Sequence, residues 1–144
     1  MTVDIVDLEP GDPRLASEVL PVLQELRPHL DAETFAAVYA EGHPQGYRFT
    51  AAYAGGRCVG VAGWRIIATV HVHRKLYVDD LVTSAADRSG GVGNALLAWL
   101  EEKARAAGCT ILDLDSGVHR HDAHRFYFRE RMYISSHHFV KQLR

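Results

Sequence analysis

The chain is poor in cysteine and contains no long apolar run. It has two cysteines among 144 residues, Cys58 and Cys109, and both lie inside apolar stretches. That placement predicts buried free thiols rather than a disulfide framework or a nucleophile. No stretch approaches the roughly 20 apolar residues of a membrane-spanning helix, and the first residues lack the basic-then-apolar pattern of a secretory leader. We therefore expect a cytoplasmic protein without a membrane partner.

An excess of one charge and low-complexity sequence are also missing. Sixteen basic residues (Lys and Arg) stand against eighteen acidic ones, a formal net charge of −2. Neither an overall positive field nor a basic stripe interleaved with aromatics is present, so nucleic acid is not an expected partner. The chain has no repeat or linker, and 47% of its residues are apolar. It is predicted to fold as one domain over residues 1–144 without help from a metal or disulfide.

The sequence does contain a regular succession of strand and helix patterns. Apolar periodicity and turn residues predict strands over 3–7, 47–54, 57–69, 76–83, 110–114 and 137–143, and helices over 13–26, 32–41, 91–107 and 122–131. Asp31 and Asp122 are expected to cap the second and fourth helices, and Gly55-Gly56 to close a hairpin. Antiparallel strands come first and a strand–helix–strand crossover later. This order predicts an α/β fold with a mixed sheet and helices on both faces.

One segment carries most of the chemical information. The strand ending in Leu81-Val82-Thr83 runs through a glycine-rich turn directly into the helix that starts near Gly91. Such a turn leaves backbone N–H groups pointing outward at the positive end of the helix dipole, where a phosphate or pyrophosphate binds well. The Lys-Ser/Thr pair of a P-loop is absent, and so is the third glycine of a dinucleotide fingerprint.

The loop resembles the acetyl-CoA loop of the GNAT superfamily. That pattern is Arg or Gln, two residues, Gly, one residue, then Gly or Ala, and Arg88, Gly91 and Gly93 match it. Leu81-Val82-Thr83 resembles the family's central strand, and Ala123-His-Arg-Phe126-Tyr127 resembles its late helix. The likeness in element order spans almost the whole chain, while the residue-level match covers about 76–139.

The resemblance implies a fold and a ligand. The mostly antiparallel sheet would splay between the strands at 76–83 and 110–115, with pantetheine paired to backbone groups of Leu81, Val82 and Thr83. The pyrophosphate would rest on backbone amides of the loop, which are those of Arg88, Ser89, Gly90, Gly91, Val92, Gly93, Asn94 and Ala95. The implied reaction is acetyl transfer from acetyl-CoA to a primary amine of a small molecule or a peptide. The alternative is a non-catalytic acyl-CoA sensor or interaction module of the same fold, and dimers occur often in the family.

Three residues are catalytic candidates. By the resemblance, Tyr127 is the acid that protonates the leaving thiolate, although a core tyrosine with a satisfied hydroxyl is the competing interpretation. Asp79 and Asp80 are candidates for the base, directly or through water. As neighbours on a strand, their side chains are expected on opposite faces, so only one would reach the acceptor. The alternative is that one is a solvated charge and the other the buried partner of an arginine.

The acceptor pocket is expected from residues 28–47 and 66–75. The candidates to line it are His29, Tyr39, His71 and His73, and the last two also titrate near neutrality and are second candidates for the base. Three features depart from the family pattern, namely Arg120, Arg131 and Met132, and they leave the acceptor side of the site open. No metal is expected, because no cysteine or carboxylate pattern completes a tetrahedral set with His119, His121 and His124.

Overall fold

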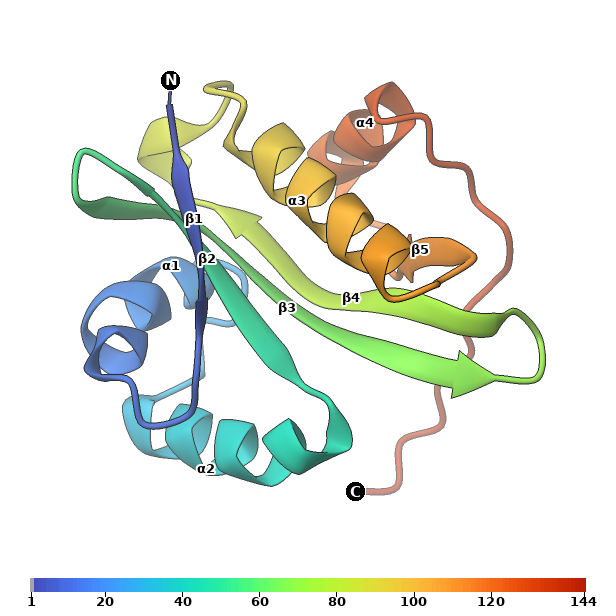
Figure 1. Ribbon diagram of the computed structural model, residues 1–144, viewed down its shortest axis with the longest axis horizontal. Helices are drawn as coiled ribbons and strands as arrows, with labels where there is room; N and C mark the ends of the chain where they lie inside the picture. The colour runs from blue at the N-terminus through green and yellow to red at the C-terminus, as the bar shows by residue number, and fades with distance from the viewer. Residues whose placement is uncertain (1) are drawn as a thin grey trace. The chain divides into compact units, whose positions relative to one another are not determined.

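The computed structural model describes residues 2–144 and divides the chain into two units, one ending at Asp113 and one running from Leu114 to Arg144. A five-stranded sheet has the order β1-β2-β3-β4-β5 (Figure 1). The strands are β1 (Asp4–Leu8), β2 (Arg48–Ala54), β3 (Arg57–Thr69), β4 (His73–Thr83) and β5 (Ile111–Leu114). The strand order and the helices confirm the predicted α/β class. The prediction of a single domain over 1–144 stays a prediction.

The first four strands pair antiparallel in chain order. The predicted turn at Gly55-Gly56 is confirmed, since both glycines have positive φ, 58° and 77°, as a tight hairpin requires. Hydrogen bonds tie the start of β5 to the start of β4, where the N–H of Thr110 donates to the carbonyl of Arg74 at 2.9 Å. The splay expected between these two strands further along stays a prediction.

The first predicted helix contains a π-helical turn. A π-helical turn (Leu15–Val19) precedes α1 (Leu20–Leu23), and the N–H of Leu20 donates to the carbonyl of Leu15, five residues back. Pro21 follows directly and has no N–H to donate, so a regular α-helical ladder cannot run through it. The predicted helix is therefore confirmed over 13–23 with a π-helical turn inside it, and it ends at Leu23 rather than at residue 26. Its apolar face is buried as expected.

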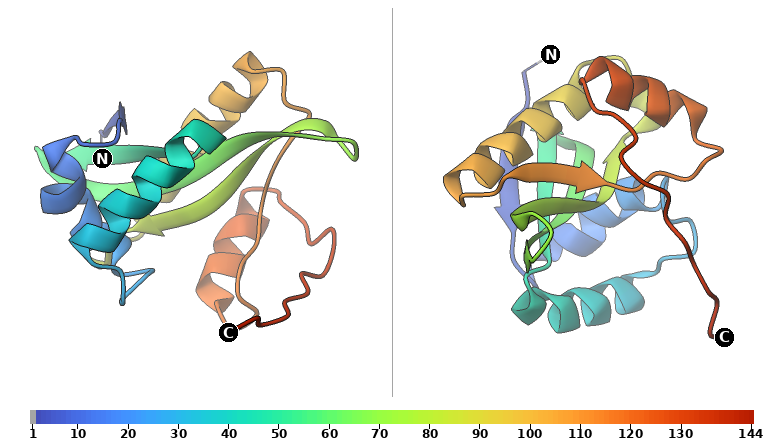
Figure 2. Two further views of the ribbon diagram at one scale, coloured as in Figure 1. Left: turned by 90° about the horizontal axis from the view of Figure 1, so that it is seen from below. Right: turned by 90° about the vertical axis from the view of Figure 1, so that its right-hand side faces the viewer.

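Helix α2 (Ala32–Gly42) begins where the sequence predicts. The Asp31 side chain accepts a hydrogen bond from the N–H of Thr34 at 2.7 Å, which confirms the cap. Helices α1 and α2 cover one face of the sheet and α3 (Val92–Ala106) covers the other (Figures 1 and 2). The side chains buried between the sheet and the first two helices include those of Leu8, Val19, Leu23, Phe35, Tyr39, Phe49, Ala51, Val61 and Val82.

A glycine on β3 lets α3 approach the sheet. A Cβ on Gly60 would lie 2.7 Å from Val92 Cγ1 and 2.9 Å from Leu96 Cδ1. The absence of a side chain there brings the first turn of α3 down onto the sheet. At the other end of the helix, Gly108 has a φ of 76°, as expected for a glycine that ends a helix.

The second unit contains α4 (His121–Arg129) and an extended segment. Asp122 does not cap α4, because Arg120 is the N-cap residue and makes no side-chain cap bond. Asp122 instead lies in the first turn, where it pairs with Arg125 at 2.6 Å. The strand predicted over 137–143 is also absent. Alternating apolar residues there lack a neighbouring strand to complete a ladder, and the side chains of Phe139 and Leu143 are exposed.

In the part of the chain that the structure describes, no helix combines the length and apolar character needed to cross a membrane.

Candidate active site

The glycine-rich loop opens onto the N-terminus of α3 as predicted. Gly91 is the N-cap residue with a φ of 83°, and no side chain caps the helix. Ser89 also has a positive φ, 71°. Since the first-turn N–H groups of any α-helix have no carbonyl partner four residues back, a helix start without a capping side chain presents donors to an anion. The 15-residue helix adds its dipole to this attraction.

The segment entering the loop is anchored by an ion pair between a buried aspartate and a half-exposed arginine. Asp87 is 6% exposed, and its carboxylate accepts two hydrogen bonds from Arg57 on β3, at 2.6 and 2.8 Å. Chiefly because of these bonds, the pKa of Asp87 lies below its usual value. The N–H of Ala85 donates to Glu25 Oε1 at 2.8 Å. The loop is thus fixed to β3 and to the segment after α1 before it reaches α3.

Arg88 follows this anchor and keeps an accessible guanidinium. Its side chain is 63% exposed, and Nη2 lies 3.9 Å from Glu25 Oε1. At that distance the pair is a loose ion pair rather than a hydrogen bond. A guanidinium held loosely beside a helix N-terminus suits phosphate oxygens.

Strand β4 has an irregularity at Asp79. Gly63 of β3 is opposite Asp80, whereas Trp64 is opposite Val78, so Asp79 is an extra residue in the ladder. A bulge of this kind shifts the side-chain alternation. Asp80 lies on the same face of the sheet as Gly63. Arg65 is two residues from Gly63 on β3, so its side chain is on that face too. Asp79 binds Arg65 and therefore also lies on that face. The expectation that the two carboxylates leave opposite faces was wrong for this reason.

Asp80 is a buried carboxylate with two tight partners. It is 7% exposed; Oδ1 accepts from Arg27 Nε at 3.0 Å, and Oδ2 accepts from the Tyr47 hydroxyl at 2.5 Å. Burial and the neighbouring Asp80 charge raise the pKa of Tyr47, so its hydroxyl stays protonated and donates. Gly63 makes the space, since a Cβ there would collide with Asp80 Oδ2 and lie 2.9 Å from Phe49 Cε1.

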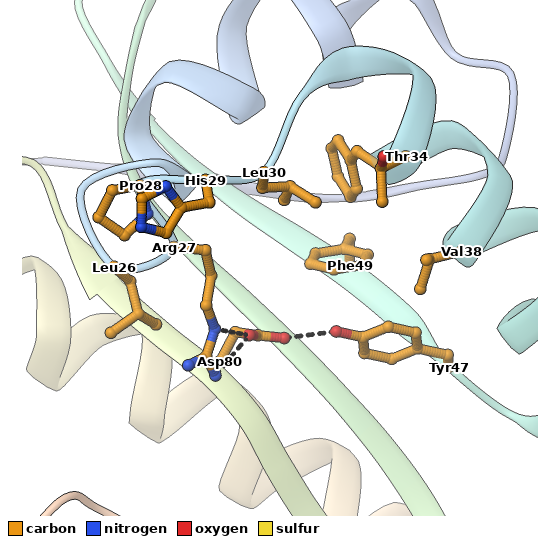
Figure 3. A pocket seen from close by; sticks show the side chains of 11 residues that line it. Leu26, Arg27, Pro28, His29, Leu30, Thr34, Val38, Tyr47, Phe49 and Asp80 are labelled. Atoms are coloured by element: carbon orange, nitrogen blue, oxygen red, sulfur yellow. Dashed lines mark hydrogen bonds and ion pairs between the residues drawn. The ribbon is translucent and has the colours of Figure 1, made fainter. Parts of the chain in front are cut away.

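A cavity of about 520 Å³ opens beside this carboxylate (Figure 3). It lies under the segment between α1 and α2 and against β2 and β4. Its walls are made by Leu26, Arg27, Pro28, His29, Leu30, Thr34, Phe35, Val38, Tyr47, Phe49 and Asp80. The volume falls in the range of small-molecule sites. Two predicted residues, His29 and Asp80, therefore both line this cavity, although they are 51 positions apart in the sequence.

Asp79 takes part in a different contact. Its carboxylate accepts two hydrogen bonds from Arg65, both at 2.8 Å, and its backbone carbonyl accepts from Arg27 Nη2 at 3.0 Å. It does not line the cavity. The interpretation of one aspartate as the partner of an arginine holds for both residues, and only Asp80 also faces the cavity.

Three of the predicted acceptor residues lie away from the cavity wall. Tyr39 is 1% exposed; its hydroxyl donates to the carbonyl of Leu8 and accepts from the N–H of Phe49, as a core tyrosine does. His71 and His73 are exposed at the turn between β3 and β4. His73 is seven residues from Asp80 along the strand, roughly 23 Å at 3.3 Å per residue. The structure does not bring these two histidines to Asp80.

The cavity and loop residues that sequence reasoning missed are Tyr47 and Arg57. Arg57 follows the Gly55-Gly56 hairpin, and Tyr47 precedes β2, so neither lies in a recognisable motif. Both act through pairs that are distant in sequence, 33 residues for Tyr47–Asp80 and 30 for Arg57–Asp87. A buried acid predicts that a partner exists but does not identify it.

Tyr127 lies on α4 in the second unit. Burial raises its pKa above the ordinary value, while Arg120 opposes this shift. The hydroxyl is therefore protonated at neutral pH, as a proton donor must be. Along residues 81–83, β4 uses one edge to pair with β3, through Leu81–Ala62, Val82–Val61 and Thr83–Gly60. Pairing of pantetheine at the other edge stays a prediction.

Among residues 2–144, no group of three or more His, Cys, Asp or Glu side chains is arranged to hold a metal ion. The rings of His121 and His124 have centroids 6.2 Å apart, and His124 Nε2 lies 2.8 Å from the carbonyl of Gly117. The histidine cluster noted in the sequence is thus engaged in local contacts on α4.

The site residues comprise a strand, an anchored glycine loop, a helix N-terminus without a side-chain cap and a cavity lined by a buried carboxylate. Residues 13–132 match the family described as "Acetyltransferase (GNAT) family", and the chain belongs to that family. It is therefore an acetyltransferase. The resemblance inferred from Arg88, Gly91 and Gly93 is confirmed.

Individual relatives agree with this assignment. The chain is 37% identical over 112 residues to "Uncharacterized N-acetyltransferase YhdJ" of Bacillus subtilis, covering 77% of this chain and 79% of the relative. It is 40% identical over 76 residues to the aminoalkylphosphonate N-acetyltransferase of Salmonella typhimurium, covering 51% and 49%. The solved aminoglycoside N-acetyltransferase AAC(6')-Iy in complex with CoA has a TM-score of 0.85 at 15% identity and covers 99% of this chain and 95% of that one. Likeness at that identity supports the fold.

Proposed function

We propose that the protein transfers the acetyl group of acetyl-CoA to a primary amine of a small molecule or a peptide. The observation that carries the proposal is the uncapped start of α3 behind a loop that the Arg57–Asp87 pair holds in place. A diphosphate is the ligand that best matches the start of an α-helix without a side-chain cap, its dipole and the loosely held Arg88. The relative in complex with CoA shares this fold.

The reaction requires the amine to be neutral when it attacks. An alkylamine with a pKa near 10.4 is neutral in only about one molecule in 2,500 at pH 7, a penalty of roughly 4–5 kcal/mol. We assign Asp80 to offset this penalty, because it is the carboxylate that faces the cavity. It receives the ammonium and accepts a proton from it, directly or through water.

The amine nitrogen forms a bond to the acetyl carbon, and the bond from that carbon to sulfur breaks. One amine proton leaves before attack and passes by way of Asp80 to solvent. A second leaves as the amide forms and, through water, replaces the proton that Tyr127 gives to sulfur. The thiolate of CoA takes a proton from Tyr127, whose hydroxyl is protonated at neutral pH. A backbone N–H near Val82 or Thr83 polarises the acetyl carbonyl. A cytoplasmic location and a homodimer stay predictions.

Release of thiol tests the proposal. The pure protein is mixed with acetyl-CoA and a panel of primary amines, and free CoA thiol is followed over time. Turnover that depends on the amine supports acetyl transfer. Binding of acetyl-CoA without turnover on any amine would instead favour the alternative, an acyl-CoA sensor with the same fold.

A further inference from the structure

The cavity beside Asp80 has mostly apolar walls. Leucine, proline, valine and phenylalanine side chains make up most of its lining; they are those of Leu26, Pro28, Leu30, Phe35, Val38 and Phe49. Figure 3 shows Leu30, Val38 and Phe49 on the side of Tyr47 and Asp80 that faces α2. Removing apolar ligand surface from water into such walls is favourable.

The charged groups of the cavity cancel one another. Among its lining residues, Arg27 and Asp80 are the charged pair, and they contact each other at 3.0 Å. The guanidinium of Arg27 also donates to the carbonyl of Asp79. The positive charge of Arg27 is therefore offset by the carboxylate of Asp80, so a phosphonate or carboxylate on the acceptor would meet no net positive charge and would lie close to a like charge. Arg27 is the one arginine or lysine among the lining residues.

The carboxylate of Asp80 still has room for a cation. A carboxylate has about four lone-pair sites. Arg27 occupies Oδ1, and the Tyr47 hydroxyl occupies one site of Oδ2. The remaining site of Oδ2 can accept one further hydrogen bond, which an ammonium or amine N–H supplies. Asp80 is thus the one carboxylate in a mostly apolar lining, whose other polar side chains besides Arg27 and Tyr47 are His29 and Thr34.

We propose that the acceptor is a primary amine carried on an apolar body, an alkyl chain or an aryl-alkyl group with no anionic substituent. Its nitrogen binds at Asp80, and its body fills the space between Leu30, Phe35 and Val38. This inference rests on the proposed function and names the substrate class of the same site. It distinguishes this chain from the aminoalkylphosphonate N-acetyltransferase, a relative whose match covers 51% of this chain.

A homologous series of acceptors measures the apolar contribution. Burying one CH₂ group is worth about 0.8 kcal/mol, which corresponds to about fourfold in kcat/KM. We expect kcat/KM to rise about fourfold per carbon from ethylamine to butylamine and to level off when the cavity is filled. 2-Phenylethylamine should rank with the best acceptors. 2-Aminoethylphosphonate and β-alanine, of similar length to propylamine, should be at least tenfold poorer than it.

Two variants of α2 make the test specific to the cavity. Val38 lines the cavity and is 46% exposed, and its neighbour Ala37 is exposed on the same helix outside the lining. Val38→Glu should flatten the dependence on chain length and lower kcat/KM for butylamine about tenfold, with KM for acetyl-CoA unchanged. Ala37→Glu adds the same charge one residue away and should keep the wild-type series.

The outcomes separate the two proposals. A rising series that Val38→Glu flattens and Ala37→Glu preserves supports the apolar-amine site. Faster turnover of the phosphonate or the amino acid than of propylamine, or a flat series in the wild type, overturns the inference while acetyl transfer stands. Release of no thiol with any of these amines, from protein that binds acetyl-CoA, overturns the proposed function and the inference together.

Discussion

Replacing Asp80 by Asn tests the role of the buried carboxylate with little change of shape. The variant keeps an oxygen for the Tyr47 hydroxyl and removes the charge that holds Arg27. A hydrogen bond to a charged group is worth about 1.5–3 kcal/mol and a neutral one about 1. Since half of the Arg27 side chain is exposed and can be resolvated, we expect the smaller part of that difference, about 0.5–1 kcal/mol. For a chain of this size, that lowers Tm by roughly 2–3 °C.

Activity should fall much further than stability. Loss of a positioned proton acceptor typically costs 10²-fold or more, so kcat/KM for the amine should drop at least about 100-fold while KM for acetyl-CoA is kept. Asp79→Asn is the matched control, because it removes a charge from the adjacent pair with Arg65 outside the cavity. It should lower Tm similarly and activity only a few fold. Steady-state thiol release and thermal unfolding measure both. Activity of Asp80→Asn within twofold of wild type, or equal losses in the two variants, would refute the assignment.

Three further substitutions probe the loop, the acid and the space behind the carboxylate. Arg57→Met removes the partner of Asp87 and should raise KM for acetyl-CoA about tenfold without changing KM for the amine; a change in the amine alone would contradict the anchoring role. Tyr127→Phe should lower kcat roughly 100-fold. Because burial raises the pKa of Tyr127, loss of its proton should lower wild-type kcat only at clearly alkaline pH. A decline of wild-type kcat at acidic or neutral pH that is absent from the variant would contradict the assignment. Gly63→Ala should displace Asp80 and reduce both Tm and kcat/KM, whereas an unchanged variant would show that the close approach is unimportant.

Features governed by neighbouring residues could be predicted from the sequence. The Asp31 cap, the Gly55-Gly56 hairpin and the glycine loop before α3 each depend on a few consecutive residues, and each appears where expected. The first helix also follows from its apolar periodicity, and it is helical over 13–23. Its π-helical turn precedes Pro21, a residue without an N–H to donate, but the proline alone does not indicate which helical form precedes it.

Features that depend on register or on distant partners could not be predicted in this way. The bulge at Asp79 arises from how β4 pairs with β3, and it alone brings Asp79 to the same face as Asp80. Arg27 and Asp80 are 53 residues apart in the sequence, and no local pattern joins them. The segment 137–143 shows the converse, because strand-like alternation forms no strand without a partner to pair with.

Binding of coenzyme A by titration calorimetry tests the central claim most directly. If the amides at the start of α3 receive the pyrophosphate, coenzyme A should bind at one site per chain, and pantetheine, which lacks the pyrophosphate, at least tenfold more weakly. Coenzyme A and pantetheine binding equally well, or no heat with coenzyme A at millimolar concentration, would contradict the account.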